Sequence, residues 1–343
     1  MSLRWGITGA SRISHDFCYA IKSKLTATEH EIVAIASRSK DSAEAFAKTH
    51  NIAKAYGSYL ELAKDTNVEV VYVAVLNPQH FEVCKLIIEH GKHVVCEKPF
   101  CMNYMQAKEL IALAQDKCVF IMEGLWSRFF PIYRHLSRLI DMQGLGEIKE
   151  VYVKHGFAGT HSERITKKDL GGGIVLDIGC YALQFVLLVF REAPKVIKAS
   201  GKINSDGVDL YFEVDLTFSN GRTAKIICSG LEQLENQATI ISTKGPICIP
   251  TYWCPTRMVA SGHVQDWPLL DTPIAFNFTN SIGLKYEADE VKNCIRSGKL
   301  HCDIASTADT LLIAQIQDEI RKQIGVRYEC DKQQLLEKNK SEI

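Results

Sequence analysis

The sequence predicts an α/β protein of two domains. Residues 1–124 are expected to form a parallel-sheet domain, and residues 125–343 an α+β domain with a large, mostly antiparallel open sheet. Three observations support this prediction. Short apolar runs alternate with helical patterns through the first third of the chain, as in βαβ units. Beyond about residue 145, apolar residues recur at every second position instead. The 343 residues are also enough for two domains.

The first domain is predicted to alternate strands and helices. Its expected strands are 3–7, 31–36, 68–76, 93–96 and 118–124, and its expected helices are 13–25, 42–50, 80–90 and 104–115. The segment 68–76 is almost continuously apolar, which is typical of a parallel strand covered on both faces. Gly91 is expected to end the helix before it. Such alternation builds a parallel sheet with right-handed crossovers.

The second domain is predicted to be richer in strands, at 150–157, 196–203, 208–218, 223–229 and 238–242. Within 208–218, apolar residues alternate with Asp209, Tyr211, Glu213 and Asp215, so this strand should have one solvated face. Asn220-Gly221 predicts a type I′ hairpin turn after it. A helix over 177–190 is expected to pack against the sheet. Helices over 286–297 and 306–325 follow and are candidates to pack back on the first domain.

Composition narrows the classes of partner. The 40 basic and 40 acidic side chains cancel, so no overall field favours nucleic acid or an anionic membrane. None of the 12 cysteines forms a C-x-x-C pair, and most lie in apolar segments. Buried free thiols in a reducing compartment explain them better than zinc or disulfides, and no metal is expected. No signal or membrane-spanning segment is predicted, so the expected location is cytoplasmic.

Lys98 stands at the end of a predicted strand, in the run Cys96-Glu97-Lys98-Pro99. Pro99 stops the strand because it lacks the N–H that a ladder needs. In open α/β sheets, ligands bind at the carboxyl ends of the strands. An ammonium group is costly to bury without a partner, so Lys98 indicates a ligand-binding or catalytic position. Taken alone, a solvated lysine on a turn explains the same pattern.

The turn after the first strand reads Gly6-Ile7-Thr8-Gly9-Ala10-Ser11-Arg12-Ile13. Glycine allows a tight turn there, and the N–H groups of the following helix N-terminus attract a pyrophosphate. Gly9 fills the first position of a G-x-G-x-x-G fingerprint, whereas Ser11 and Ser14 replace the other two glycines. An ordinary strand–helix turn would also fit this degenerate motif. Its place directly after the first strand favours a Rossmann dinucleotide-binding domain.

The end of the second strand bears on the choice of dinucleotide. Folds that prefer NAD place Asp or Glu there to bond the ribose 2′-hydroxyl, but this chain has Ser37-Arg38-Ser39. A guanidinium can pair with a 2′-phosphate and stack on adenine. The sequence therefore predicts NADP, with a surface arginine at a strand end as the alternative.

A second cluster combines glycines with candidate acid–base groups. Gly171-Gly172-Gly173 allows close approach to a ligand, and the predicted helix after it carries Asp177 and Tyr181 on one face. A tyrosine can act as a general acid only if its pKa falls from about 10, which a nearby ammonium such as that of Lys98 would bring about. Asp177 would orient the pair or hold a substrate hydroxyl. Read separately, Tyr181 fits a packing residue and Asp177 a helix cap.

Together these motifs resemble the Gfo/Idh/MocA oxidoreductase family over almost the whole chain. Many members have His in place of Tyr181, and tyrosine is typical of the branch of glucose–fructose oxidoreductase and dimeric dihydrodiol dehydrogenase. The matching motifs are the Gly9 loop, Asn77-Pro78-Gln79-His80, Glu97-Lys98-Pro99, Gly171-Gly172-Gly173 with Asp177, Gly179 and Tyr181, Ala55-Tyr56-Gly57-Ser58-Tyr59, Met122-Glu123, Trp126-x-Arg128-Phe129-Phe130-Pro131, Trp253-Cys254-Pro255-Thr256, and Tyr286-Glu287-Ala288.

The resemblance implies hydride transfer at nicotinamide C4, with Tyr181 as acid and base, Lys98 tuning it and Asp177 in the catalytic set. The candidate residues of the NADP site are Gly6, Gly9, Ser11, Arg12, Ile13, Ser37, Arg38, Asn77, His80, Glu97 and Lys98. The residues that the resemblance assigns to the substrate pocket are His80, Trp126, Arg128, His155, Phe157, Trp253 and Phe278. The sequence departs from the dihydrodiol dehydrogenase branch at His155-Gly156-Phe157, where that branch has Phe-Gly. A more polar floor of the substrate pocket is therefore expected.

The implied activity is NADP-dependent oxidation or reduction of a secondary alcohol or carbonyl in a trans-dihydrodiol or an aldose such as D-xylose. Another sugar, polyol or carbonyl substrate of the same family is the first alternative. An NAD(P)-dependent glycosidase and a non-catalytic NADP-sensing regulator are the others. The expected partners are a small-molecule substrate and a second copy of the chain, since family members of this architecture pair open sheet faces.

Overall fold

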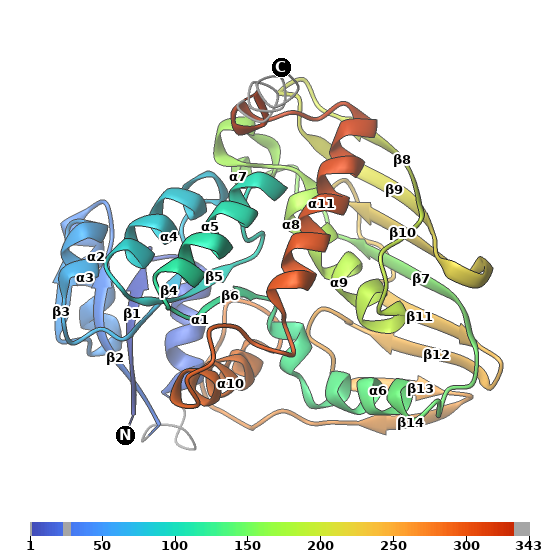
Figure 1. The fold of residues 1–343 in the computed structure, drawn as a ribbon, viewed down its shortest axis with the longest axis horizontal. Helices are drawn as coiled ribbons and strands as arrows, with labels where there is room; N and C mark the ends of the chain where they lie inside the picture. The colour runs from blue at the N-terminus through green and yellow to red at the C-terminus, as the bar shows by residue number, and fades with distance from the viewer. Residues whose placement is uncertain (1, 23–28, 333–343) are drawn as a thin grey trace. The chain divides into compact units, whose positions relative to one another are not determined.

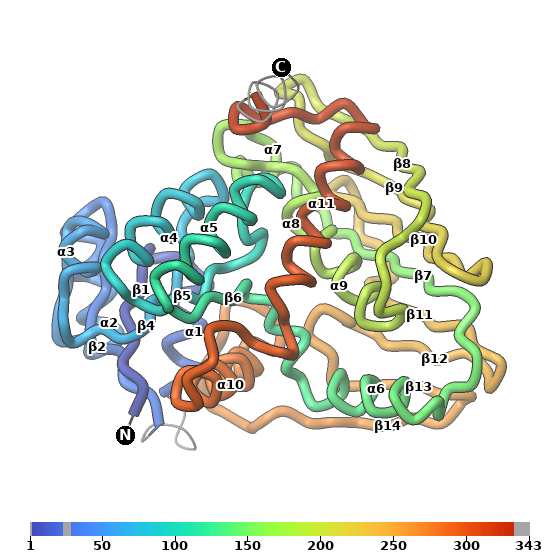
Figure 2. Tube along the Cα trace, in the orientation of Figure 1, coloured from blue at the N-terminus to red at the C-terminus, as the bar shows by residue number. Residues whose placement is uncertain are grey.

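A computed structural model describes residues 2–22 and 29–332 (Figure 1). The described chain forms two compact units. The first comprises residues up to 100 together with 108–129 and 269–307, and the second comprises 101–107, 130–268 and the chain from 308 onward. Segment 269–307 therefore belongs to the first unit. The single domain boundary predicted after residue 124 had placed this segment in the second domain. The path of the chain, including this orange segment, can be followed in Figure 2.

The first unit contains the predicted parallel sheet. Its six strands lie in the order β3-β2-β1-β4-β5-β6, and every neighbouring pair is parallel. This is the strand order of a Rossmann fold, with its topological switch between β1 and β4. The strands are β1 (Leu3–Thr8), β2 (His30–Ala36), β3 (Lys54–Tyr56), β4 (Val70–Val73), β5 (His93–Glu97) and β6 (Ile121–Gly124).

Apart from α3, the helices of this unit follow the predicted ones closely. They are α1 (Arg12–Ile21), α2 (Lys40–His50), α3 (Tyr59–Lys64), α4 (His80–Glu89), α5 (Tyr104–Asp116) and α10 (Leu284–Arg296). The expected last residues of the first helix, 23–25, lie outside the described residues. Short β3 and α3 were not predicted, because three and six residues are too few to show a period. Gly91 has φ 73° and ends α4, and its N–H donates to the Ile88 carbonyl at 2.9 Å.

The second unit contains a sheet of eight strands in the order β14-β13-β12-β11-β7-β10-β9-β8. Only β7 and β10 pair in parallel, so the prediction of a mostly antiparallel sheet is confirmed. The strands are β7 (Ile148–Gly156), β8 (Val196–Ile203), β9 (Asp209–Thr217), β10 (Thr223–Ser229), β11 (Gln237–Ser242), β12 (Gly245–Pro250), β13 (Arg257–Ala260) and β14 (His263–Asp266). The last three were not predicted.

The β9–β10 hairpin has the predicted turn. Asn220 lies at φ 58°, ψ 29°, and Gly221 lies at φ 71°. Both central residues are therefore in the left-handed region that a type I′ turn requires. Asn and Gly reach that region at low cost, which is why this dipeptide identified the turn from sequence.

The predicted helix over 177–190 is wrong as a single element. It is divided at Ile178 (φ −115°, ψ −17°) into α8 (Ile174–Asp177) and α9 (Gly179–Phe190). The segment Lys168–Phe190 is long and apolar enough to cross a membrane, but its most apolar stretch is entirely buried inside the protein. The core helix of a globular protein can be equally long and apolar, so burial explains the near-continuous apolar sequence of α9. The remaining helices here are α6 (Pro131–Asp141), α7 (Glu163–Thr166) and α11 (Thr307–Ile324).

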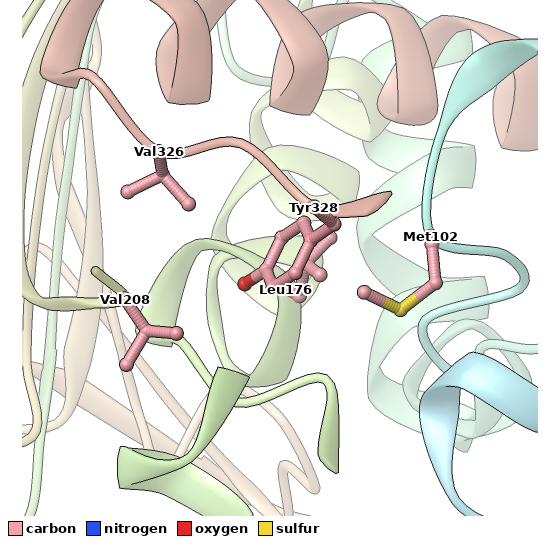
Figure 3. Packing of buried hydrophobic residues seen from close by; sticks show 5 residues of the cluster. All are labelled: Met102, Leu176, Val208, Val326 and Tyr328. Atoms are coloured by element: carbon pink, nitrogen blue, oxygen red, sulfur yellow. The ribbon is translucent and has the colours of Figure 1, made fainter. Parts of the chain in front are cut away.

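The predicted solvated face of β9 is wrong at Asp209. Its side chain is fully buried, and its carboxylate accepts the Val175 N–H at 2.7 Å at the start of α8. The carboxylate thus satisfies a free N–H of a helix N-terminus, which the alternation of the strand could not reveal. Beside it, a buried apolar cluster gathers around the Tyr328 ring (Figure 3). Its members are Met102, Leu176, Val208, Val326 and Tyr328.

Candidate active site

Gly9 forms the tight turn between β1 and α1. It has φ 88°, and a Cβ atom there would lie 2.6 Å from the Ala74 carbonyl oxygen at the end of the neighbouring strand. Any other residue would collide with this backbone, so glycine is required here. The loop lies at the switch between β1 and β4, where this class of sheet binds its ligand.

Serines take the places of the other two fingerprint glycines. Ser11 is the N-cap of α1, and its hydroxyl accepts the Ser14 N–H at 3.2 Å. The buried Ser14 hydroxyl donates to the Gly9 carbonyl at 2.7 Å and so ties the helix back to the turn. The loop keeps the compact shape of a phosphate-binding turn with side-chain hydrogen bonds in place of glycines. These residues fit a dinucleotide pyrophosphate at the N-terminus of α1.

Gly6, Arg12 and Ile13 have different surroundings. Gly6 lies inside β1 rather than in the loop, and a Cβ atom there would come within about 3 Å of Val68 and Leu62. Its small size therefore serves helix–sheet packing. Arg12 and Ile13 begin α1, and the Arg12 guanidinium lies 5.0 Å from the centre of the Phe278 ring.

Asp16 was missed by the sequence analysis. Its fully buried carboxylate on α1 accepts the Asn277 N–H at 2.8 Å and the Phe278 N–H at 2.9 Å. This pair of bonds fixes the segment that carries Phe278 beside the nucleotide loop. An aspartate within an amphipathic helix gives no signal of this role, because its partners lie far along the chain.

Ser37 and Arg38 follow the end of β2, as predicted. The Ser37 N–H donates to the Tyr56 carbonyl at 3.2 Å, which places this turn against β3. Arg38 is exposed, and it forms no hydrogen bond or ion pair with the residues that the structure describes. Its positive charge lowers the pKa of Tyr59, although burial raises that pKa by more. The residues at this strand end fit a 2′-phosphate, because no carboxylate stands there.

Asn77 and His80 lie beyond the end of β4. Asn77 is buried and starts a short 3₁₀ helix, Asn77–Gln79. The buried His80 ring has Nδ1 2.8 Å from the Pro99 carbonyl and Nε2 3.1 Å from the Val75 carbonyl. Burial lowers its pKa, and Lys98 lowers it further. Each ring nitrogen thus faces a backbone carbonyl, and a neutral ring donates to one of the two, so His80 contacts both loops at this sheet edge.

Lys98 stands directly after β5, as predicted, on a loop with several backbone hydrogen bonds. The Glu97 carboxylate accepts the Lys98 N–H at 3.2 Å and a short hydrogen bond from the Tyr72 hydroxyl. Glu123 of β6 accepts the Phe100 N–H at 3.0 Å. Together with the His80 contact to Pro99, these bonds hold residues 97–100, here called the Lys98 loop, at the carboxyl edge of the sheet.

Trp126 and Arg128 follow β6 in a buried 3₁₀ helix, Trp126–Phe129. The Arg128 guanidinium donates to the Ile304 carbonyl at 3.4 Å. Phe278 is 44% exposed. The other described pocket residues that were predicted in the first unit, His80, Trp126 and Arg128, are buried.

In the second unit, Asp177 ends α8 and Tyr181 lies in the first turn of α9, both buried. Arg164 donates to the Asp177 carboxylate at 2.8 and 3.3 Å through its two terminal nitrogens. Asp177 ends α8, and the N-cap position of α9 is taken by Ile178. Asp177 and Tyr181 thus lie on either side of the Ile178 break. Lys98 belongs to the first unit, and its pairing with Tyr181 stays a prediction.

His155 lies at the centre of an aromatic cluster in the second unit. Its ring stacks on Trp253 at 4.4 Å, and Nδ1 lies 3.1 Å from the Tyr252 hydroxyl. The centre of the Tyr181 ring is 6.3 Å away. Burial raises the pKa of Tyr252 well above its usual value, so this hydroxyl stays protonated. Phe157 follows on the same strand end, where its N–H donates to the Ser229 carbonyl at 3.0 Å.

Comparison with protein families matches both units. Residues 3–125 match the family described as "Oxidoreductase family, NAD-binding Rossmann fold", and residues 133–248 match the "GFO/IDH/MocA C-terminal domain". The Rossmann fold read from the Gly9 loop and strand order is therefore confirmed.

Curated relatives and solved structures match nearly the whole chain. A trans-1,2-dihydrobenzene-1,2-diol dehydrogenase from Danio rerio is 43% identical over 97% of this chain and 100% of its own length. The relative of the same name from Homo sapiens is 38% identical over the same shares. A solved 3-ketoreductase from Actinomadura kijaniata, in complex with NADP and TDP-benzene, has a TM-score of 0.79 at 22% identity and covers 94% of this chain and 98% of its own.

Proposed function

This chain belongs to the Gfo/Idh/MocA oxidoreductase family, and we propose that it is an NADP-dependent dehydrogenase of trans-dihydrodiols or aldoses such as D-xylose. The observation that carries the proposal is the 43% identity, over 97% of this chain, to a relative named trans-1,2-dihydrobenzene-1,2-diol dehydrogenase. The first unit carries the Gly9 loop, which would bind the pyrophosphate, and the Lys98 loop, which carries the candidate catalytic lysine.

The proposed cofactor site follows the carboxyl edge of the parallel sheet. The α1 N-terminus after Gly9 would receive the pyrophosphate, and Arg38 would pair with the 2′-phosphate. Asn77 and the Lys98 loop stand at the ends of β4 and β5, on the nicotinamide side of such a site. Bound NADP would supply the hydride acceptor at nicotinamide C4.

The proposed acid–base group is Tyr181, which would exchange a proton with the reacting oxygen of the substrate. The Lys98 ammonium would stabilise its phenolate and so lower its pKa. The ion pair of Asp177 with Arg164 fixes the direction of this carboxylate at the end of α8. Asp177 would therefore orient a substrate hydroxyl.

The proposed substrate wall is aromatic with one polar floor residue. Trp253 and its stacked neighbour His155 would face a flat diol ring or the apolar side of a sugar. Trp126, Phe157 and Phe278 are the other proposed wall residues. His155 and Tyr252 share a hydrogen bond, which makes this floor more polar than an all-aromatic wall.

A substrate screen tests this proposal. Purified protein is incubated with NADP or NAD and with trans-dihydrodiols, D-xylose and other aldoses, and absorbance at the wavelength of the reduced nicotinamide is followed. Stable reduction of NADP by a diol or aldose is expected. Hydrolysis of a glycoside without net reduction would contradict it, and so would tight NADP binding with no turnover of any compound.

We further propose that the chain acts in the cytoplasm as a homodimer that pairs the open faces of its second-unit sheet. Tyr152 and Val196 are large residues of this sheet that are more than 40% exposed. Glu213 and Asp215 keep the face partly polar. Light scattering at micromolar concentration should give twice the monomer mass. A dimer that persists after Tyr152→Glu would contradict the proposed face.

A further inference from the structure

Glu287 is a carboxyl group buried inside the first unit. It lies on α10 in the first unit (Figure 1), its side chain is fully buried, and neither carboxylate oxygen has a hydrogen-bond partner among the described residues. A carboxylate in such a place is very costly, because burial removes its hydration and nothing replaces it. The cost is much smaller if the group carries a proton, although its O–H then needs an acceptor.

The surroundings of Glu287 are acidic. The charged and titratable groups that face it are Glu97 of β5, Cys302 of the loop before α11, and Glu123 of β6. Burial first, and then these neighbours, raise the pKa of Glu287 well above its usual value. The position of a Cβ atom on Gly124 of β6 lies 3.4 Å both from Glu287 Oε1 and from Glu97 Cα, so these two atoms are no more than about 6.8 Å apart.

Two of these neighbours hold the Lys98 loop. Glu97 accepts the Lys98 N–H, and Glu123 accepts the Phe100 N–H on the other side of Pro99. A charged carboxylate accepts such bonds more strongly than a neutral one. A third negative charge beside them would repel both. The loop is therefore held best when Glu287 is the carboxyl group that keeps the proton.

We propose that Glu287 is an uncharged carboxylic acid that donates a hydrogen bond to the Glu97 carboxylate, and that this pair positions the Lys98 loop. Glu287 is thus a positioning residue that acts through Glu97, and it touches neither substrate nor cofactor. Its effect on turnover rests on the proposed function, whereas its protonation and its hold on the loop do not.

Infrared difference spectroscopy tests the protonation without substrate. Wild type minus Glu287→Gln at pH 7 should show the C=O stretch of one protonated carboxyl group. Glu290→Gln, one turn along the same helix and partly exposed, is the matched control and should not remove this band. If wild type minus Glu287→Gln shows only carboxylate bands, Glu287 is ionised and the proposal fails.

Hydrogen exchange and kinetics test the positioning. Gln can still donate to Glu97, whereas Leu cannot. In Glu287→Leu, amides in a peptide covering residues 96–101 should exchange about tenfold faster, the loss expected for one hydrogen bond to a charged group. Glu287→Gln should match wild type. If the enzyme turns over, kcat should fall about tenfold in Glu287→Leu with KM little changed.

Equal exchange in the Leu and Gln variants would overturn the positioning role. Faster exchange throughout the protein in Glu287→Leu would also overturn it, because it would show general destabilisation instead. A wild-type enzyme that reduces no NADP would disprove the proposed function and leave the infrared and exchange results to decide this inference.

Discussion

The carboxylate of Asp16 in α1 accepts hydrogen bonds from both the backbone N–H and the side-chain amide of Asn277, each at 2.8 Å, across 261 residues of sequence. It also accepts the Phe278 N–H. One buried side chain thereby holds the segment that returns from the second unit against the first helix of the Rossmann domain.

Asp16→Ala should destabilise the first unit by about 2–4 kcal/mol. The change leaves the Asn277 and Phe278 N–H groups without their acceptor, and each such group costs about 1–3 kcal/mol. The free energy of unfolding in urea measures the effect. Asp41→Ala, at an exposed position in the first turn of α2, is the control and should cost less than about 1 kcal/mol.

Arg38→Ala should weaken binding of NADP at least about tenfold and leave NAD binding nearly unchanged. Only NADP carries a 2′-phosphate for the guanidinium to pair with. Fluorescence titration with NADPH and NADH measures both constants. Lys48→Ala removes an exposed positive charge from α2 and is the control. Equal losses for the two cofactors would mean that Arg38 makes no 2′-phosphate contact.

Lys98→Met should leave the fold intact and lower kcat by more than about a hundredfold, the scale of a lost acid–base contribution. The methionine keeps the length of the side chain and removes the ammonium that would tune Tyr181. Lys117→Met, at an exposed position, is the control. Tyr181→Phe should cause a similar loss. Turnover near that of wild type in folded Lys98→Met would remove Lys98 from the catalytic set.

Asp209 should make the second unit less stable as pH rises. Burial raises its pKa from 3.8 to about 6 in the folded protein. Below pH 3.8 both states hold the proton; between 3.8 and 6 only the folded state does, so stability is lost through this window. The loss amounts to about 3 kcal/mol, because a pKa shift of one unit corresponds to about 1.4 kcal/mol.

Urea unfolding of wild type and Asp209→Asn from pH 4 to 7 measures this loss. The variant cannot ionise, so its stability relative to wild type should rise with pH and level off above about pH 6. Asp215→Asn, an exposed position on the same strand, should show no such trend. A constant difference between wild type and Asp209→Asn would show that Asp209 has an ordinary pKa.

The sequence by itself determined the class of each unit and the local motifs. β8 and β10 were predicted to the residue. β9 was predicted to within one residue at each end, because its strong alternation carries its signal within a few positions. The Gly9 turn, the end of β5 before Pro99 and the Asn220-Gly221 turn were also readable. Each depends on the conformational limits of a glycine, a proline or an asparagine, which act within the local chain.

Only the tertiary structure decided which polar residues are buried and what they bind. Asp209 follows the outward phase of β9, yet it lies inside because the N-terminus of α8 needs an acceptor there. Asp16, Glu123 and Glu287 look like ordinary helix or strand residues, and their roles arise from partners more than 20 residues away. The sequence pattern reports average polarity along one element. Burial and hydrogen bonding of a charged group are set by whichever other element folds against it.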